Sequence, residues 1–181
     1  GFLSQAGYLD KKVENSVLDK KIKDSFTQIW TIFFEFQIPT IIGWKKFFGD
    51  IETWSIWAQC AYNQNLVINK SFKENLSPEL TADNFIEKLN NEGTQGLNAM
   101  TISELSGVPR PTALRKLNNL IKRKLLKKDK NNLYLLFGVP KLDTKTIEKD
   151  INLKTIRDIN KTNEERFIKM LTKILNTIVF N

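Results

Sequence analysis

The chain has 181 residues, of which 41% are hydrophobic and 27% charged, and this composition predicts a folded protein with a core of its own. It has no histidine and a single cysteine, so an intrachain disulfide and a metal site of thiolates and imidazoles are excluded. The commonest general base is therefore missing, and the acidic residues show no spacing typical of a metal site or an acid-base pair. We expect a protein that is not an enzyme and that needs no cofactor.

The amino-terminal segment lacks the basic stretch, apolar run and cleavage site of a secretory signal, so we expect a cytoplasmic protein. Apolar residues then recur at helical spacing and predict a helix from Val17 to Ile38, which Pro39 is expected to end because proline removes a backbone donor. Polar residues and Pro39 interrupt the apolar run between Phe26 and Trp44. A membrane span is therefore disfavoured, and no membrane partner is expected.

A second helix is predicted from Asp50, a plausible N-cap, to about Tyr62. The amino-terminal half of the chain contains all four tryptophans, for which core packing is favoured, while a subunit interface and an aromatic pocket for a small-molecule effector stay open. Cys60 has no adjacent cation, which favours an inert buried thiol over an oxidant sensor. The tryptophans are Trp30, Trp44, Trp54 and Trp57.

A polar connector from Asn63 to Asn75 precedes Ser77-Pro78-Glu79, which is typical of a helix start. The helix that it opens is expected to pack on the two helices that follow, as the first helix of a small domain. Its apolar residues are Leu80, Phe85, Ile86 and Leu89.

The segment from Leu97 to Leu136 has the signals of two short helices joined by a tight turn. Asn98 is a good N-cap for the first helix, with Thr101 and Glu104 as a competing capping box, and Gly107 is expected to end it. Pro111 suits the first turn of the next helix. This layout predicts a helix-turn-helix.

Side chains between and after these helices support the same prediction. Val108 is expected to fill the space between the two helices. In the second helix, apolar residues at spacings of three and four predict one buried stripe. This stripe comprises Ala113, Leu117, Leu120, Ile121 and the stem of Lys124.

Two short apolar runs, Leu125 to Lys128 and Leu133 to Phe137, follow the second helix and are separated by the turn-forming cluster Asp129 to Asn132. They predict a β-hairpin, placed where a winged helix has its wing. A last helix is predicted from Thr162, capped with the help of Glu165. Its apolar face serves either dimerisation or packing on the amino-terminal helices; the face consists of Phe167, Met170, Leu171, Ile174, Leu175 and Ile178.

Positive charge is concentrated in the same segment. Residues 97–130 hold nine cations and two anions, a net charge of +7 out of +8 for the whole chain. Such a concentration is typical of a surface that binds a polyanion, because each lysine or arginine at a phosphate releases counterions. A solvated basic face is the alternative for this cluster taken alone.

The run TISELSGVPRPTALRKLNNLIKRKLLKKDKNNLYLL resembles the winged-helix domain of bacterial MarR-like transcription regulators, over about forty residues. The resemblance implies a homodimer that binds double-stranded DNA. It also implies that the second helix of the motif lies in the major groove and the wing beside the minor groove.

Residue types suggest which side chains have which role. Guanine pairs with arginine, adenine with asparagine and thymine with the threonine methyl, so Thr112, Arg115 and Asn119 are the candidates for reading bases. Other cations are candidates for phosphate contacts, which fix register without reading sequence. These are Arg110, Lys116, Lys122, Arg123, Lys127, Lys128 and Lys130.

The predicted fold is mainly α with a small β-hairpin wing, a winged helix-turn-helix with amino- and carboxyl-terminal helical extensions for dimerisation. The predicted regions are 1–75, a helical region with an interface and a possible ligand pocket; 76–138, the DNA-binding domain; and 139–181, a dimerisation segment. The predicted function is sequence-specific transcription regulation. A winged-helix module that binds a protein partner is the alternative, and a nucleic-acid-processing enzyme is the third and least favoured interpretation.

Overall fold

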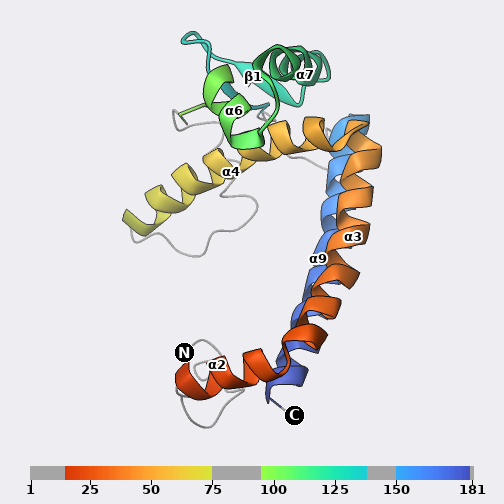
Figure 1. Ribbon diagram of the computed structural model, residues 1–181. Coiled ribbons are helices and arrows are strands. Elements are labelled where there is room, and N and C mark those ends of the chain that lie inside the picture. The colour runs from red at the N-terminus through yellow and green to blue at the C-terminus, as the bar shows by residue number, and fades with distance from the viewer. Residues whose placement is uncertain (1–14, 75–94, 138–149, 180–181) are drawn as a thin grey trace. The chain divides into compact units, whose positions relative to one another are not determined.

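A computed structural model describes residues 15–74, 95–137 and 150–179 of the chain. The described chain is mainly α-helical, with six helices and one two-stranded antiparallel hairpin that directly follows a helix (Figure 1), as a winged-helix-like arrangement requires. The elements are α2 (Asn15–Asp24), α3 (Phe26–Phe48), α4 (Ile51–Glu74), α6 (Ala99–Ser106), α7 (Arg110–Lys122), β1 (Leu126–Lys128), β2 (Tyr134–Leu136) and α9 (Ile151–Val179).

Contacts divide the chain into two compact units. Unit 1 comprises Gly1–Ile42 and Asn160–Asn181, and unit 2 comprises Gly43–Ile159. The predicted boundary near residue 75 is not where this division falls, since α4 belongs to unit 2 and contacts α6, α7 and β2. The predicted helix beginning at Ser77 lies outside the described residues.

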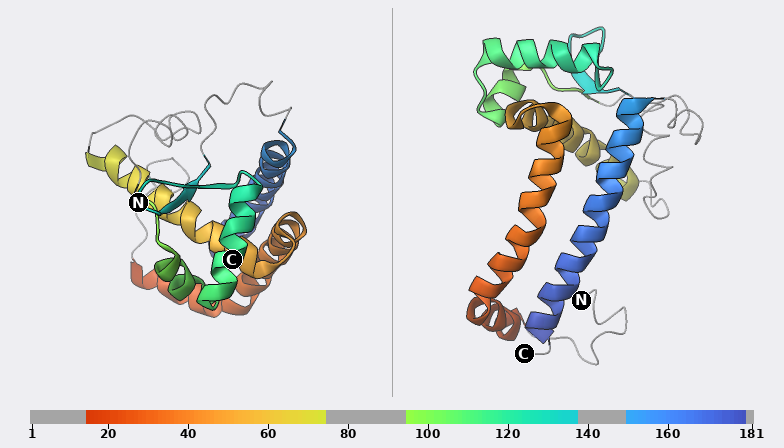
Figure 2. Two further views of the ribbon diagram at one scale, coloured as in Figure 1. Left: turned by 90° about the horizontal axis from the view of Figure 1, so that it is seen from above. Right: turned by 90° about the vertical axis from the view of Figure 1, so that its right-hand side faces the viewer.

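In unit 1, α3 and α9 run antiparallel and meet through their side chains (Figure 2). The rings of Phe36 and Phe167 lie 5.7 Å apart, and the Thr40 hydroxyl donates to Asn163 Oδ1 at 3.2 Å. Glu35 and Lys173 form an ion pair. The packing of the last helix against an amino-terminal helix, one of the two roles expected for it, is thus present within one chain.

The predicted end of the first helix at Pro39 is wrong. The break lies instead at Ser25, between α2 and α3, and α3 continues through Pro39 to Phe48. Proline costs α3 one backbone hydrogen bond. Burial of apolar side chains on both sides of Pro39 outweighs this loss: Ile32 is buried before it, and Trp44 and Phe48 are buried after it.

The starts of the longer helices follow from local capping. Asp50 is the N-cap of α4, as predicted, and its Oδ1 accepts a hydrogen bond of 2.7 Å from the backbone N–H of Thr53. Helix α4 continues past the predicted end at Tyr62 to Glu74. Asp150 caps α9 in the same way, accepting from the N–H of Asn152 at 2.9 Å, so this helix begins eleven residues before the predicted start at Thr162.

The two predicted helices and the tight turn between them are present. Asn98 accepts from the N–H of Thr101 and is the N-cap of α6, which settles the choice against the competing capping box. Gly107 follows the helix with a φ of 68°, a left-handed conformation that favours glycine. Val108 is buried, and the Ser103 hydroxyl donates to its carbonyl oxygen at 2.6 Å. These bonds fix the turn that leads into α7.

Helix α7 buries Ala113, Leu117 and Leu120 as predicted. It ends in a Schellman motif, in which the N–H of Leu125 donates to the carbonyl of Leu120 and the N–H of Lys124 to that of Ile121. Lys124 occupies the left-handed position of this motif, with a φ of 57°, and its side chain is exposed. The expectation that its stem joins the buried stripe is therefore wrong.

The predicted hairpin is present, with Leu126 opposite Leu136 and Lys128 opposite Tyr134. Asp129 Oδ1 accepts from the backbone N–H groups of Asn131 and Leu133, which closes the turn. An isolated bridge joins Leu97 to Tyr134 and adds a third segment beside β2. This approach is close enough that a Cβ on Gly96 would lie 2.7 Å from the carbonyl oxygen of Tyr134.

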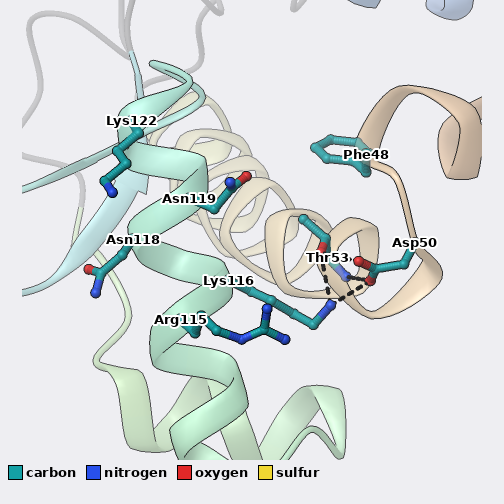
Figure 3. A pocket seen from close by; sticks show the side chains of 8 residues that line it. All are labelled: Phe48, Asp50, Thr53, Arg115, Lys116, Asn118, Asn119 and Lys122. Carbon is teal, nitrogen blue, oxygen red and sulfur yellow. Dashed lines mark hydrogen bonds and ion pairs between the residues drawn. The ribbon is translucent and has the colours of Figure 1, made fainter.

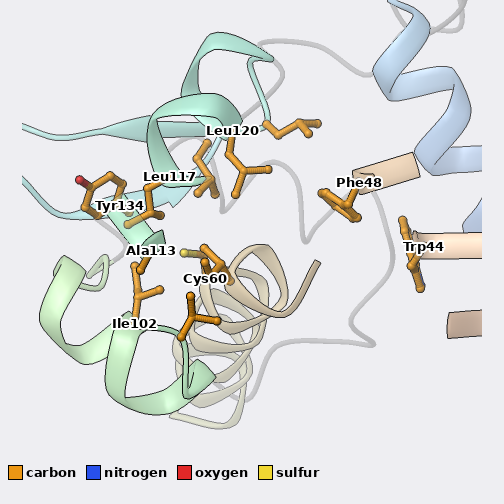
Figure 4. Packing of buried hydrophobic residues seen from close by; sticks show 12 residues of the cluster. Trp44, Phe48, Cys60, Ile102, Ala113, Leu117, Leu120 and Tyr134 are labelled. Carbon is orange, nitrogen blue, oxygen red and sulfur yellow. The ribbon is translucent and has the colours of Figure 1, made fainter. Parts of the chain in front are cut away.

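The core of unit 2 lies between α4 and the helix-turn-helix with its hairpin (Figure 4). Its aromatic part contains Trp44, Phe48 and Trp57, whose rings pack at 5.2–5.9 Å, so these two tryptophans have the core role that the sequence favours. Cys60 is also in this core, and burial raises the pKa of its thiol to about 12. A buried thiol is the result that we expected, and its raised pKa favours low reactivity. None of the helices within the described ranges is long and apolar enough to cross a membrane.

Candidate nucleic-acid interface

Helix α7 has two faces of different character. Its buried face packs on α4 and α6 through Ala113, Leu117 and Leu120. The opposite face presents Arg115, Asn119 and other polar side chains to solvent. Arg115 and Asn119 are four residues apart and so lie one helical turn apart on this face. The structure thus brings together two of the three residues that we assigned to base reading.

The exposed face borders a hollow of about 640 Å³ between α7 and the corner where α3 meets α4 (Figure 3). Side chains of α7 line one wall, and the other wall is formed by three residues of the corner. Amide, guanidinium and ammonium groups therefore face one open space. The lining residues are Arg115, Lys116, Asn118, Asn119 and Lys122 from α7, and Phe48, Asp50 and Thr53 from the corner.

Lys116 is only 8% exposed, unlike the other α7 side chains that line the hollow. Its Nζ lies 2.7 Å from Asp50 Oδ1 and 3.2 Å from Glu52 Oε2, and it donates to the Thr53 hydroxyl at 3.1 Å (Figure 3 shows the Asp50 and Thr53 contacts). The predicted phosphate contact of Lys116 is at odds with this geometry, because its ammonium group is already surrounded by oxygen atoms of α4 and its N-cap. Lys116 joins α7 to the start of α4.

Two opposing effects act on the Asp50 carboxylate. Burial alone would raise its pKa, but hydrogen bonds from Lys116 and from Thr53, together with the charge of Lys116, outweigh it. The pKa of Asp50 therefore lies below its ordinary value, and the carboxylate stays charged at neutral pH. One side chain thus caps α4 and pairs with α7.

Arg123 also lies against the protein rather than at the open face. Its Nη2 donates to the carbonyl oxygen of Phe47 at 2.8 Å, and its guanidinium lies 4.8 Å from the centre of the Phe47 ring. Burial lowers the pKa of Arg123. Its carbonyl oxygen accepts from Asn152 at 3.0 Å. The guanidinium predicted to contact phosphate instead joins the end of α7 to the end of α3.

The remaining predicted cations are exposed, as phosphate contacts require. Arg110 lies at the start of α7 and Lys122 at its end. The hairpin carries the others, Lys127, Lys128 and Lys130, and Lys128 Nζ lies 5.4 Å from the centre of the Tyr134 ring. Thr112, the third base-reading candidate, is half-buried in the first turn of α7. Helix and hairpin thus present to solvent five of the seven cations predicted to contact phosphate.

Sequence reasoning missed four lining residues: Phe48, Asp50, Thr53 and Asn118. Asn118 could have been predicted from the sequence, since it lies three residues after exposed Arg115 and four before exposed Lys122. The other three come from a segment more than sixty residues away, and no local pattern connects them to α7. A weaker signal did exist for Lys116, which lies three residues after buried Ala113 and four before buried Leu120.

The arrangement places hydrogen-bond donors and cations at one open face. Within residues 15–74, 95–137 and 150–179, no group of acidic or cysteine side chains is placed to hold a metal ion. The open face carries donors and cations, which suit the oxygen atoms of a polyanion and the edges of bases. Comparison of the chain with family models, with curated proteins and with solved structures finds no match.

Proposed function

We propose that the protein is a sequence-specific transcription regulator that binds double-stranded DNA in the cytoplasm as a homodimer. The observation that carries the proposal is the exposed face of α7, where Arg115 and Asn119 lie beside Lys122 and next to a basic hairpin. An α-helix fits the major groove, and these side chains match the donor and acceptor patterns of guanine and adenine.

The proposed interface is smaller than residue types alone suggest. Arg115 and Asn119 read bases, with Thr112 at the edge of the reading face. Phosphate contacts come from five other exposed cations of α7 and the hairpin and not from Lys116 or Arg123, which are bound within the protein. The proposed phosphate-binding residues are Arg110, Lys122, Lys127, Lys128 and Lys130.

The proposal is tested by base discrimination. A preferred site is first selected from a random duplex library with the wild-type chain, and binding to that site and to single-base variants is then measured. Replacement of Arg115 by alanine is expected to weaken binding to the selected site by about 1–3 kcal/mol and to remove the preference at one base pair. Lys128→Ala is the matched control and is expected to weaken all sequences alike.

Unchanged discrimination in Arg115→Ala would show that α7 does not read bases through this residue. Failure to select any preferred sequence would contradict sequence-specific binding altogether. If a site is found, a reporter gene placed behind it tests regulation: its expression should change when the wild-type chain is present and not when Arg115→Ala is.

A further inference from the structure

The outer ridge of α3 carries large apolar side chains that the fold leaves exposed. Five of them recur at every fourth residue, and each is 40–57% exposed. The three aromatic side chains form a continuous row, since the ring centre of Trp30 lies 5.8 Å from that of Phe26 and 5.2 Å from that of Phe34. We call these residues the α3 ridge; they are Phe26, Trp30, Phe34, Ile38 and Ile42.

The side of α3 that contacts α9 carries different residues. Ile32 is buried, Phe36 packs on Phe167, and Glu35 and Thr40 bond to side chains of α9. The contacts with α9 therefore do not account for the α3 ridge. Exposed aromatic residues in a continuous row are uncommon on a monomer surface and indicate a contact with another molecule.

We infer that the α3 ridge is the interface with a second copy of this chain. Residues spaced by four form a ridge inclined to the helix axis, and two such ridges interdigitate when the helices cross at about −50°, the commonest packing class. This packing class requires a row of residues spaced by four on each of the two helices. A second copy related by a twofold axis supplies it, so the α3 ridge is self-complementary.

The exposed area is sufficient for such an interface. Covering the exposed fractions of all five side chains removes at most about 500 Å² from water on each copy, or about 1,000 Å² for the pair, which is the lower limit for a specific interface. The ridge also carries no charged residue, so two copies meet there without buried like charges. The inference rests on the homodimer in the proposed function. It depends on α3 alone, so it can fail while DNA binding is still observed.

The test measures the mass of the whole chain in solution by light scattering after size exclusion, with no DNA present. The wild type is expected to be a dimer. Trp30→Glu and Phe34→Glu are each expected to raise the dissociation constant about 30-fold or more, because the centre of an interface contributes most of its energy. Leu66→Glu is the matched control: Leu66 is an equally exposed apolar residue on α4, and this variant is expected to remain a dimer.

A second measurement separates dissociation of the dimer from unfolding of the chain. Cys60 is buried, so a single cysteine introduced at Phe34 is the accessible thiol for cross-linking of the folded chain. Phe34→Cys is expected to give a covalent dimer on oxidation, whereas Leu66→Cys gives none. A wild-type monomer at tens of micromolar, or glutamate variants that stay dimeric, would overturn the inference. So would equal cross-linking at the two positions.

Discussion

Lys116 shows how a side chain's surroundings decide its role. By residue type it belongs with the cations of α7 for which we propose DNA contacts, but its ammonium group lies among Asp50, Glu52 and Thr53. The ion pair joins two elements that are 66 residues apart in the sequence. We interpret Lys116 as a positioning residue, which holds α7 against the start of α4.

Lys116→Met is expected to lower the free energy of unfolding by about 1–2 kcal/mol. Removing one partner of a buried ion pair costs more than this, but here both carboxylates are about half exposed, so water replaces part of the interaction. Urea unfolding measures the change. Lys122→Met removes an exposed lysine of the same helix as a control and should stay within about 0.5 kcal/mol of the wild type.

The pH dependence of unfolding identifies the partner in this pair. The pKa of Asp50 is lowered in the folded protein, so its stabilising contribution is present above the ordinary carboxyl pKa of about 4 and disappears as the pH falls through the lower, folded value. The stability difference between wild type and Asp50→Asn should therefore shrink as the pH falls below about 4. A difference that stays constant down to a pH of about 2 would contradict the pairing.

At the scale of the secondary-structure element, capping and turn residues correctly predict those helix ends and turns that are fixed by nearby residues. Asn98, Gly107, Asp50 and the Asp129 turn all act where the sequence places them, because a cap or turn bonds to backbone within a few residues. The end at Pro39 was predicted wrongly for the opposite reason. Whether a helix continues through a proline depends on what its two halves bury, and those partners are distant in the sequence.

Substitutions at the ends of α6 and α7 are expected to change the free energy of unfolding in opposite directions. Both Gly107 and Lys124 have left-handed backbones, with φ of 68° and 57°, and a side chain in this conformation costs roughly 1–2 kcal/mol. Gly107→Ala should therefore lower the free energy of unfolding by about 1 kcal/mol, and Lys124→Gly should raise it by about the same amount. Thermal or urea unfolding checks both. Equal signs for the two variants would show that backbone conformation is not the cause.

Across the whole molecule, the sequence predicts the two short helices, their turn and the hairpin, but it does not predict that α4 packs on them. The motif is built from interactions within about forty residues, which periodicity and turn residues encode. The helix that completes it is α4, and its membership depends on long-range packing of Ile56, Cys60 and Gln64, the last of which accepts from the backbone N–H of Leu136. Periodicity identifies the apolar face of such a helix but not its partner.

The same limit applies to the candidate site. The exposed face with Arg115 and Asn119 follows from the stripe of apolar residues opposite it. The second wall of the hollow, with Phe48, Asp50 and Thr53, does not, because it comes from another part of the chain. Charge counting likewise overstates the number of free cations on α7, since it includes Lys116 and Arg123, which are bound within the protein.

The salt dependence of binding to duplex DNA tests the central proposal most directly. Each lysine or arginine that binds a phosphate contributes about −0.9 to the slope of log K against log salt concentration. We predict tight, steeply salt-dependent binding by the wild type, and a slope that is shallower by about 0.9 in Lys128→Ala, which removes one phosphate-binding lysine. The double variant Lys116→Met with Asp50→Asn, which leaves the net charge unchanged, should keep the wild-type slope. No binding at low salt, or a wild-type slope in Lys128→Ala, would contradict the proposal.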